Sequence, residues 1–229
     1  MLTKNIKFKN FHNSQNKKNI KKIFLNIKKK ILNRSELFFF SLSSKYKFSF
    51  TNKKIDHLKK YKHYTLIGMG GSSLGAKAIY SFLSHKVKKI FTFIDNLKIE
   101  KILVNNKKNL NIIISKSGGT LETVVNFSSL KSYKNSIFIT EKRDNYLRQI
   151  ANKLKSEIFQ HKDYIGGRYS VLSETGMLPA SLMGLNVKNF KNLNSLINNQ
   201  KYINQLILNV GSILDLYNKK KNEFHYPKL

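Results

Sequence analysis

Short apolar segments alternate with helical patterns between residues 64 and 162. The third segment, NLNIIIS at 109–115, is apolar enough to be buried on both faces and leads into the turn residues SGGT. Strands of this kind, separated by helices, belong to parallel sheets with right-handed crossovers. The pattern therefore predicts an α/β fold, a parallel sheet sandwiched between helices. The expected strands are 64–69, 89–94, 109–115, 136–140 and 156–162.

Helices are expected between these strands and after them, because apolar residues recur there at helical spacing. The expected ranges are 74–85, 120–132, about 141–154, about 174–185 and 191–218, whereas 218–229 has no clear place in a fold. The residues expected to face inward are Leu74, Ala78, Phe82 and Leu83 in the first helix, and Leu121, Val124 and Val125 in the second.

The N-terminal region reads as an amphipathic helix over about 17–33, with Ile20, Ile23, Phe24 and Ile27 at helical spacing. Residues 1–50 are rich in lysine, and Glu36 is their only acid. Transit peptides share this pattern but favour arginine, so we favour an arm that packs on the following domain. The expected organisation is a basic helical extension at 1–55, a sheet domain at 56–190, and a helical segment at 191–229.

Composition narrows the protein class. The chain has 229 residues, 41% of them hydrophobic, which is enough for one large domain with an extension. The longest apolar cluster, LFFFSL at 37–42, is far shorter than a membrane span, and no secretory signal is visible at the start. The absence of cysteine excludes disulfides and thiolate metal sites and fits a cytoplasmic location.

The formal net charge of +31 has two interpretations. One is nucleic-acid binding, which we keep as an alternative function. The other is codon usage biased toward AT, which favours Lys, Asn, Ile and Phe whatever the function. Only four of the 43 basic residues are arginines, and arginine makes the commonest specific base contact. We therefore expect no specific nucleic-acid partner and no membrane partner, but adventitious binding to polyanions at low salt.

Three loops follow expected strands, at the edge of a parallel sheet where ligands bind. The first, GMGGSSLG at 68–75, resembles a dinucleotide fingerprint through Gly68 and Gly70, yet Ser73 replaces its third glycine. Ser72 and Ser73 would supply hydroxyls to a sugar or a phosphate. The alternative is a tight strand–helix turn without a ligand.

The second loop, SKSGGT at 115–120, has the composition of a phosphate site. Ser115, Ser117 and Thr120 supply hydroxyls around two glycines, just before a predicted helix. Backbone N–H groups and the helix dipole would add to them. Lys116 either adds charge to this site or is one more surface lysine.

The third loop, GGRYS at 166–170, contains Arg168, one of the few arginines. A chain that otherwise uses lysine gains from arginine here a planar, permanently charged group that can pair with an anion through two N–H groups. The alternative is an arginine that caps a turn or pairs with a nearby acid.

The strings IGMGGSSLGA, ISKSGGTLETVVN and DYIGGRYSVLSETGMLPASLMG resemble, in this order, the phosphoglucose isomerase family. The resemblance covers roughly residues 60–190, and Asp163 to Ser170 match the family's GGR[FY]S pattern. Glu174 and Thr175 stand where the family usually has small or aliphatic residues. The resemblance implies a sugar-isomerase (SIS) domain with a flavodoxin-like sheet, an N-terminal helical arm and C-terminal helices.

The resemblance also implies roles for individual residues. Gly71 and Ser72 would line the sugar site, and Arg168 would stabilise an enediolate as glucose 6-phosphate and fructose 6-phosphate interconvert in glycolysis and gluconeogenesis. Neither a metal nor another cofactor is implied, and the full-length form would be a homodimer. The residues implied to hold the substrate phosphate are Ser115, Lys116, Ser117 and Thr120.

The family's catalytic base, a glutamate in an ESxGK segment, has no counterpart here. After Glu174 the only acids are Asp215 and Glu223, and the only histidine is His225. Family members are about twice as long, so we expect an incomplete chain that is inactive alone and exposes an apolar face. A stand-alone SIS-type sugar-phosphate-binding module is the main alternative.

Overall fold

The computed structural model describes residues 16–33, 37–42, 46–97, 109–191 and 198–223. It divides the chain into two compact units, residues 37–191 and residues 1–36 with 192–229. The first unit holds the sheet, and the described part of the second contains two helices. The domain boundaries expected after residues 55 and 190 remain a prediction. None of the described helices is long and apolar enough to cross a membrane.

The sheet has five parallel strands in the order β2-β1-β3-β4-β5. This confirms the predicted α/β class, and each strand lies within two residues of its expected bounds. The strands are β1 (His63–Ile67), β2 (Ile90–Ile94), β3 (Asn109–Ile114), β4 (Ser136–Thr140) and β5 (Glu157–Gln160).

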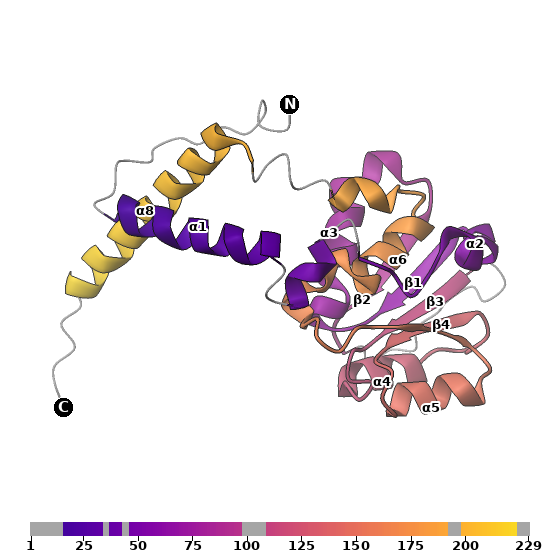
Figure 1. The fold of residues 1–229 in the computed structure, drawn as a ribbon. Coiled ribbons are helices and arrows are strands. Elements are labelled where there is room, and N and C mark those ends of the chain that lie inside the picture. Colours follow the sequence, from indigo (N-terminus) through magenta and orange to yellow (C-terminus); the bar gives the residue numbers. More distant parts are fainter. Residues whose placement is uncertain (1–15, 34–36, 43–45, 98–108, 192–197, 224–229) are drawn as a thin grey trace, which may run out of the picture. The chain divides into compact units, whose positions relative to one another are not determined.

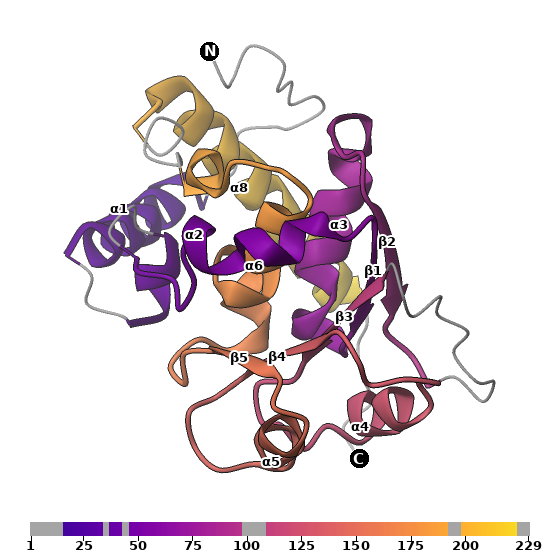
Figure 2. The same cartoon turned by 90° about the vertical axis from the view of Figure 1, so that its right-hand side faces the viewer.

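Helices cover both faces of the sheet (Figures 1 and 2). One face carries α4 (Leu121–Ser128) and α5 (Tyr146–Lys153), and the other carries α3 (Leu74–Phe82) and α6 (Glu174–Leu182). The core under α4 and α5 is built from Ile67, Ile94, Ile113, Phe127, Leu130, Phe138, Leu147 and Ala151.

The central strand β3 is buried at all six positions, as its sequence predicts. Two of these positions are polar, Asn109 and Asn111, and their amides join neighbouring strands. Thr65 Oγ1 donates to Asn109 Oδ1 (3.1 Å), Asn109 Nδ2 donates to Asn111 Oδ1 (2.8 Å), and Asn111 Nδ2 donates to Ser136 Oγ (3.3 Å). Burial is tolerated because each polar group has a partner.

The inward faces predicted for two helices are wrong. In α3, Leu74 and Phe82 are 56% and 83% exposed, and Ala78 is also exposed, whereas Ala76 and Ile79 are buried. In α4, Leu121 is 68% exposed, and the buried residues are Thr123, Asn126 and Phe127. Only Val124 of the predicted set packs on the core. Both helices carry more apolar residues than one face can bury.

Short helices complete the first unit. They are α2 (Asn52–Ile55) and the 3₁₀ helices η1 (Leu37–Leu42), η2 (Asp56–Lys60), η3 (Gly70–Ser72), η4 (Ser84–Lys86), η5 (Gly167–Leu172) and η6 (Val187–Lys191).

The second unit pairs α1 (Lys17–Asn33) with α8 (Gln200–Glu223). Ile20 packs with Ile203 and Ile207, and Phe24 and Tyr202 flank this cluster. The predicted amphipathic helix over 17–33 is therefore confirmed. Helix α8 extends through residues 218–223, to which the sequence assigned no place, and 224–229 lie outside the described residues.

Candidate functional site

Strands β1 and β3 lie side by side, but the chain leaves them toward opposite edges of the sheet. From β1 it passes through α3 to β2, and from β3 it passes through α4 to β4. The loops after β1 and β3 therefore flank the point where the strand order reverses. In open parallel sheets, ligands bind at this point.

The loop after β1 is packed tightly against β3. A Cβ atom at Gly68 would lie 2.8 Å from the carbonyl oxygen of Ile114, so a side chain does not fit there. Gly70 has a φ of +54°, the left-handed region that glycine enters without strain. Ser72 is half-buried, and its backbone N–H donates to Met69 O (3.1 Å). Ser73 is fully buried, and its Oγ donates to Gly70 O (3.3 Å).

The GGRYS segment touches this first loop directly. A Cβ atom at Gly71 would lie only 2.2 Å from Gly167 O, so the two backbones meet where both residues are glycine. Ser170 Oγ lies 3.0 Å from Gly71 O and 2.7 Å from Gly167 O and donates to this pair of carbonyls. Behind them, Gly75 of α3 leaves room for Val171. Residues that are 99 positions apart in sequence thus form one surface.

The loop after β3 is folded around the Ser115 hydroxyl. This side chain is buried, accepts a hydrogen bond from Gly118 N (3.1 Å), and lies 2.8 Å from Thr120 Oγ1. Ser117 is exposed, and its Oγ accepts from Gly119 N (3.4 Å). Thr120 precedes α4 and makes no capping hydrogen bond with its side chain. The half-buried Thr120 and the exposed Ser117 are therefore the hydroxyls of this loop that are accessible to a ligand.

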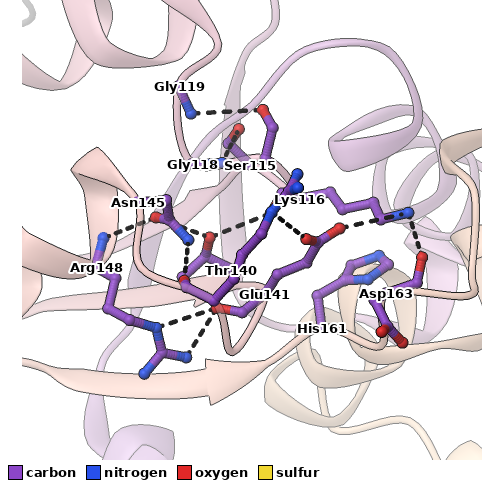
Figure 3. Close-up of polar contacts among 12 residues, drawn as sticks. Ser115, Lys116, Gly118, Gly119, Thr140, Glu141, Asn145, Arg148, His161 and Asp163 are labelled. Atoms are coloured by element: carbon purple, nitrogen blue, oxygen red, sulfur yellow. Dashed lines mark hydrogen bonds and ion pairs between the residues drawn. The ribbon is translucent and has the colours of Figure 1, made fainter.

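Asn145 holds the same loop from the neighbouring helix (Figure 3). Gly118 has a φ of +70°, and a Cβ atom there would lie 1.8 Å from Asn145 Oδ1. The same oxygen accepts from Arg148 N (3.0 Å) and caps α5, while Leu147 N donates to Gly118 O (3.0 Å). The start of α5 thus fixes the shape of the glycine turn.

Lys116 joins the loops after β3, β4 and β5 (Figure 3). Its Nζ donates to the Asp163 carbonyl (2.5 Å) and lies 3.4 Å from the carboxylate of Glu141. Glu141 is buried and also pairs with Arg143 Nε (2.7 Å). The positive charge of Lys116 is therefore shared with a buried acid.

His161 lies beside this group, at the end of β5 (Figure 3). The ring is buried, its Nδ1 lies 2.8 Å from Lys162 O, and burial lowers the pKa of His161 from its ordinary value. The ring is therefore neutral at pH 7 and adds no positive charge to the site.

Arg168 is exposed on η5, one residue after the Gly167–Gly71 contact. Within the described part of the chain it makes no hydrogen bond or ion pair, so neither a turn cap nor an acid partner is seen there. Its guanidinium group is free to bind an external anion.

The structure thus brings Gly71 into contact with the segment that carries Arg168, and it places Ser115, Lys116, Ser117 and Thr120 on one loop. Lys116 connects the two groups through Asp163. Among the described residues, no hydrogen bond joins Ser72 to Thr120 or to Arg168. Sequence reasoning missed Glu141 and Asn145, and the one available signal was an acid directly after a strand in a lysine-rich chain.

A parallel sheet of this order, with hydroxyl-bearing glycine loops at the point where the strand order reverses, defines an α/β domain with a candidate ligand site at one edge of the sheet. The family model for phosphoglucose isomerase matches residues 45–211. The chain belongs to the phosphoglucose isomerase family.

Curated relatives agree with this assignment. A glucose-6-phosphate isomerase of Methanocaldococcus jannaschii is 34% identical over 184 residues, which cover 73% of this chain and 45% of that protein. One of Borreliella burgdorferi is 37% identical over 146 residues, covering 55% of this chain and 27% of that protein. The chain spans less than half the length of these relatives.

Among solved structures, a hypothetical protein from Thermus thermophilus has a similar fold, with a TM-score of 0.59 at 24% identity. The match covers 70% of this chain and 43% of that one. It supports the architecture of the sheet and its helices.

Proposed function

We propose that this chain is the sugar-phosphate-binding domain of a glucose-6-phosphate isomerase that interconverts glucose 6-phosphate and fructose 6-phosphate in the cytoplasm. The observation that carries the proposal is the meeting of the glycine loops at one edge of the sheet, where Ser170 bonds Gly71 and Gly71 touches Gly167. The curated relatives named glucose-6-phosphate isomerase support the substrate.

The phosphate is assigned to the loop after β3. Ser117 and Thr120 present hydroxyls, and the first turn of α4 adds backbone N–H groups and the positive end of its dipole. Ser115 is buried beneath the loop and stabilises its shape, because its hydroxyl accepts a hydrogen bond from Gly118 N. Lys116 contributes only part of a charge, since Glu141 lies beside it.

The sugar is assigned to the first loop and to η5. Gly71 and Ser72 would line the ring or the open chain, and Arg168 would face the oxygens at C1 and C2. Removal of the proton between these carbons leaves an enediolate, and a fixed guanidinium stabilises its negative charge. Loss of the proton itself requires a base, and these 229 residues contain no ESxGK segment that would supply one.

Binding measurements test the assigned phosphate and sugar sites, and a turnover assay tests the expected inactivity of the chain alone. In titration calorimetry at about 0.15 M ionic strength, we expect the chain alone to bind fructose 6-phosphate only weakly, and fructose not at all. Ser117→Ala removes one hydrogen bond to a charged group and should weaken binding by roughly ten-fold. Ser128→Ala, an exposed serine on α4, is the matched control and should change nothing.

Arg168 is tested with 6-phosphogluconate, whose carboxylate replaces the reacting carbon. Arg168→Lys should weaken binding of this acid by about 10-fold and that of fructose 6-phosphate much less. Arg143→Lys is the control, because Arg143 pairs with Glu141. Equal losses for both ligands would contradict the placement of Arg168.

The chain alone should not isomerise its ligand, because loss of a general base lowers rates by about 10²–10⁴-fold. A coupled assay that shows ordinary turnover would overturn this point. Tight binding without turnover would instead favour a stand-alone sugar-phosphate-binding module, which needs no base.

A further inference from the structure

A cavity lies in the sheet-containing unit and shares no residue with the glycine loops. Its volume is about 350 Å³, within the range of small-molecule sites. One side is formed by the segment before and at the start of α2, and the other by η6. The lining residues are Tyr46, Phe48, Phe50, Asn52, Val187, Lys188 and Lys191.

Aromatic rings make up one wall of the cavity. Tyr46, Phe48 and Phe50 stand at every second position, so their side chains gather on the same side of the segment. The rings of Phe48 and Phe50 are stacked with centroids 4.9 Å apart, and Tyr46 meets Phe48 edge-on at 5.2 Å. Phe50 packs edge-on against Phe159 of β5, which anchors the wall to the sheet. The wall offers a rigid apolar surface.

The only charged group held against this wall, among the lining residues, is the ammonium of Lys191. Its Nζ lies 4.2 Å from the ring centroid of Tyr46 and 4.4 Å from that of Phe48, and it donates to Ser41 O (2.7 Å). Within the described part of the chain, Lys191 forms no ion pair with a carboxylate. Its partial burial lowers the pKa of Lys191 to about 8. Partial loss of hydration, with no paired carboxylate, disfavours the charged form of Lys191. An anionic ligand would offset this effect.

Glu174 is the acid whose charge acts on Lys191, but its carboxylate already accepts hydrogen bonds from other groups. It is fully buried at the start of α6, where Oε2 accepts from Tyr46 OH (2.7 Å) and Oε1 accepts from Ser49 N (2.9 Å). Burial together with this carboxylate raises the pKa of Tyr46, so the phenol stays neutral. Lys191 is therefore the lining cation that lies against the aromatic rings. The other lining lysine, Lys188, is exposed.

We propose that this cavity binds a small carboxylate with an aromatic or branched aliphatic body, its carboxylate paired with Lys191 and its body packed on Phe48 and Phe50. A monoanion fits better than a phosphate dianion, because the single partly desolvated ammonium of Lys191 balances one negative charge and not two. Asn52 offers amide N–H donors on the lining, since its Oδ1 accepts from Ser181 Oγ (3.4 Å). The volume accommodates one or two rings.

The probes are 2-naphthoate and its neutral analogue 2-naphthamide, titrated into the full chain by calorimetry. We expect naphthoate to bind and Lys191→Met to weaken it by at least ten-fold, because a charged hydrogen bond is lost while the apolar stem remains. Naphthamide should bind the wild type and Lys191→Met equally. Lys188→Met is the control for general loss of positive charge and should leave naphthoate binding unchanged.

The pH profile gives a second readout that general apolar binding would not move. Naphthoate stays ionised above pH 5, whereas Lys191 loses its proton near pH 8, so affinity should fall between pH 7 and about 9.5. Lys191→Arg should remove this loss because arginine stays charged. Thermal unfolding checks that each variant is folded.

Three results would overturn the proposal. One is naphthoate binding that is unaffected by Lys191→Met, another is a pH profile unaltered by Lys191→Arg, and the third is no naphthoate binding at millimolar concentration. Binding of naphthamide with no advantage for naphthoate would overturn it as well, because the cavity would then be an apolar groove without a carboxylate site.

Discussion

At the scale of single residues, adjacent glycines carry different constraints. Gly118 combines a φ of +70° with the close approach of Asn145, whereas Gly119 has nothing within 4 Å of an added Cβ atom. The letters GG in the sequence do not distinguish them. The difference arises from Asn145, a residue of the next strand–helix connection.

Gly118→Ala should lower the free energy of unfolding by about 2–4 kcal/mol, since a left-handed backbone and a collision with Asn145 add together. Gly119→Ala should change it by no more than about 1 kcal/mol. Urea unfolding of the two variants beside the wild type measures both values. Similar losses in the two variants would show that the turn does not have this geometry.

Glu174 shows what sequence reasoning finds and what it leaves out at one position. The resemblance to the family marks Glu174 as a departure from the usual residues. Its partners, Tyr46 and Ser49, lie 128 and 125 positions away, and no local pattern connects them. A buried carboxylate with two hydrogen bonds explains how the chain tolerates an acid at the start of α6.

At the scale of elements, the strands could be predicted and the helix faces could not. A largely apolar segment such as Asn109–Ile114, which ends in three isoleucines, identifies a buried strand, because a strand buried on both faces needs no further context. Helix α3 has apolar residues around most of its circumference, so its sequence is compatible with several inward faces. Packing on α6 and the sheet selects Ala76 and Ile79.

Substitutions at two positions of α3 test the observed face. Ile79→Ala should lower the free energy of unfolding by about 2–4 kcal/mol, because it opens a cavity in the core. Phe82→Ala, at a side chain that is 83% exposed, should change it by less than about 0.5 kcal/mol. A larger loss at Phe82 in thermal or urea unfolding would restore the face expected from sequence.

The candidate site was predictable as far as its loops, and not in its internal contacts. Parallel strands place the loops after β1 and β3 at one edge, so the adjacency of residues 68–75 and 115–120 follows from the fold class. The contact of Gly71 with Gly167 depends on the path of the chain after β5, which no periodicity encodes. The same holds for the bond from Lys116 to Asp163.

At the scale of the whole molecule, the net charge of +31 dominates long-range behaviour. Helix α1 carries seven lysines, Lys17, Lys18, Lys21, Lys22, Lys28, Lys29 and Lys30, and no acid. Such a surface attracts any polyanion through release of counterions. The attraction carries no sequence information and disappears with salt.

We expect duplex DNA of any sequence to bind at about 50 mM salt and to lose at least about 10²-fold in affinity by about 200 mM. Fluorescence anisotropy with two unrelated duplexes measures both the salt slope and the discrimination. Fructose 6-phosphate, a single small dianion, should lose far less over the same range. Tight, sequence-dependent DNA binding at the higher salt concentration would favour the nucleic-acid function instead.

The hydrogen bond from Ser170 to Gly71 has a consequence for folding during synthesis. The two residues bracket four of the five strands, so closing that loop carries a large entropic cost and comes late in folding. On the ribosome, the surface shared by Gly71 and Gly167 therefore cannot form until Ser170 has emerged and the strands before it have docked. A nascent chain that binds sugar phosphate through both loops would therefore already have completed its sheet.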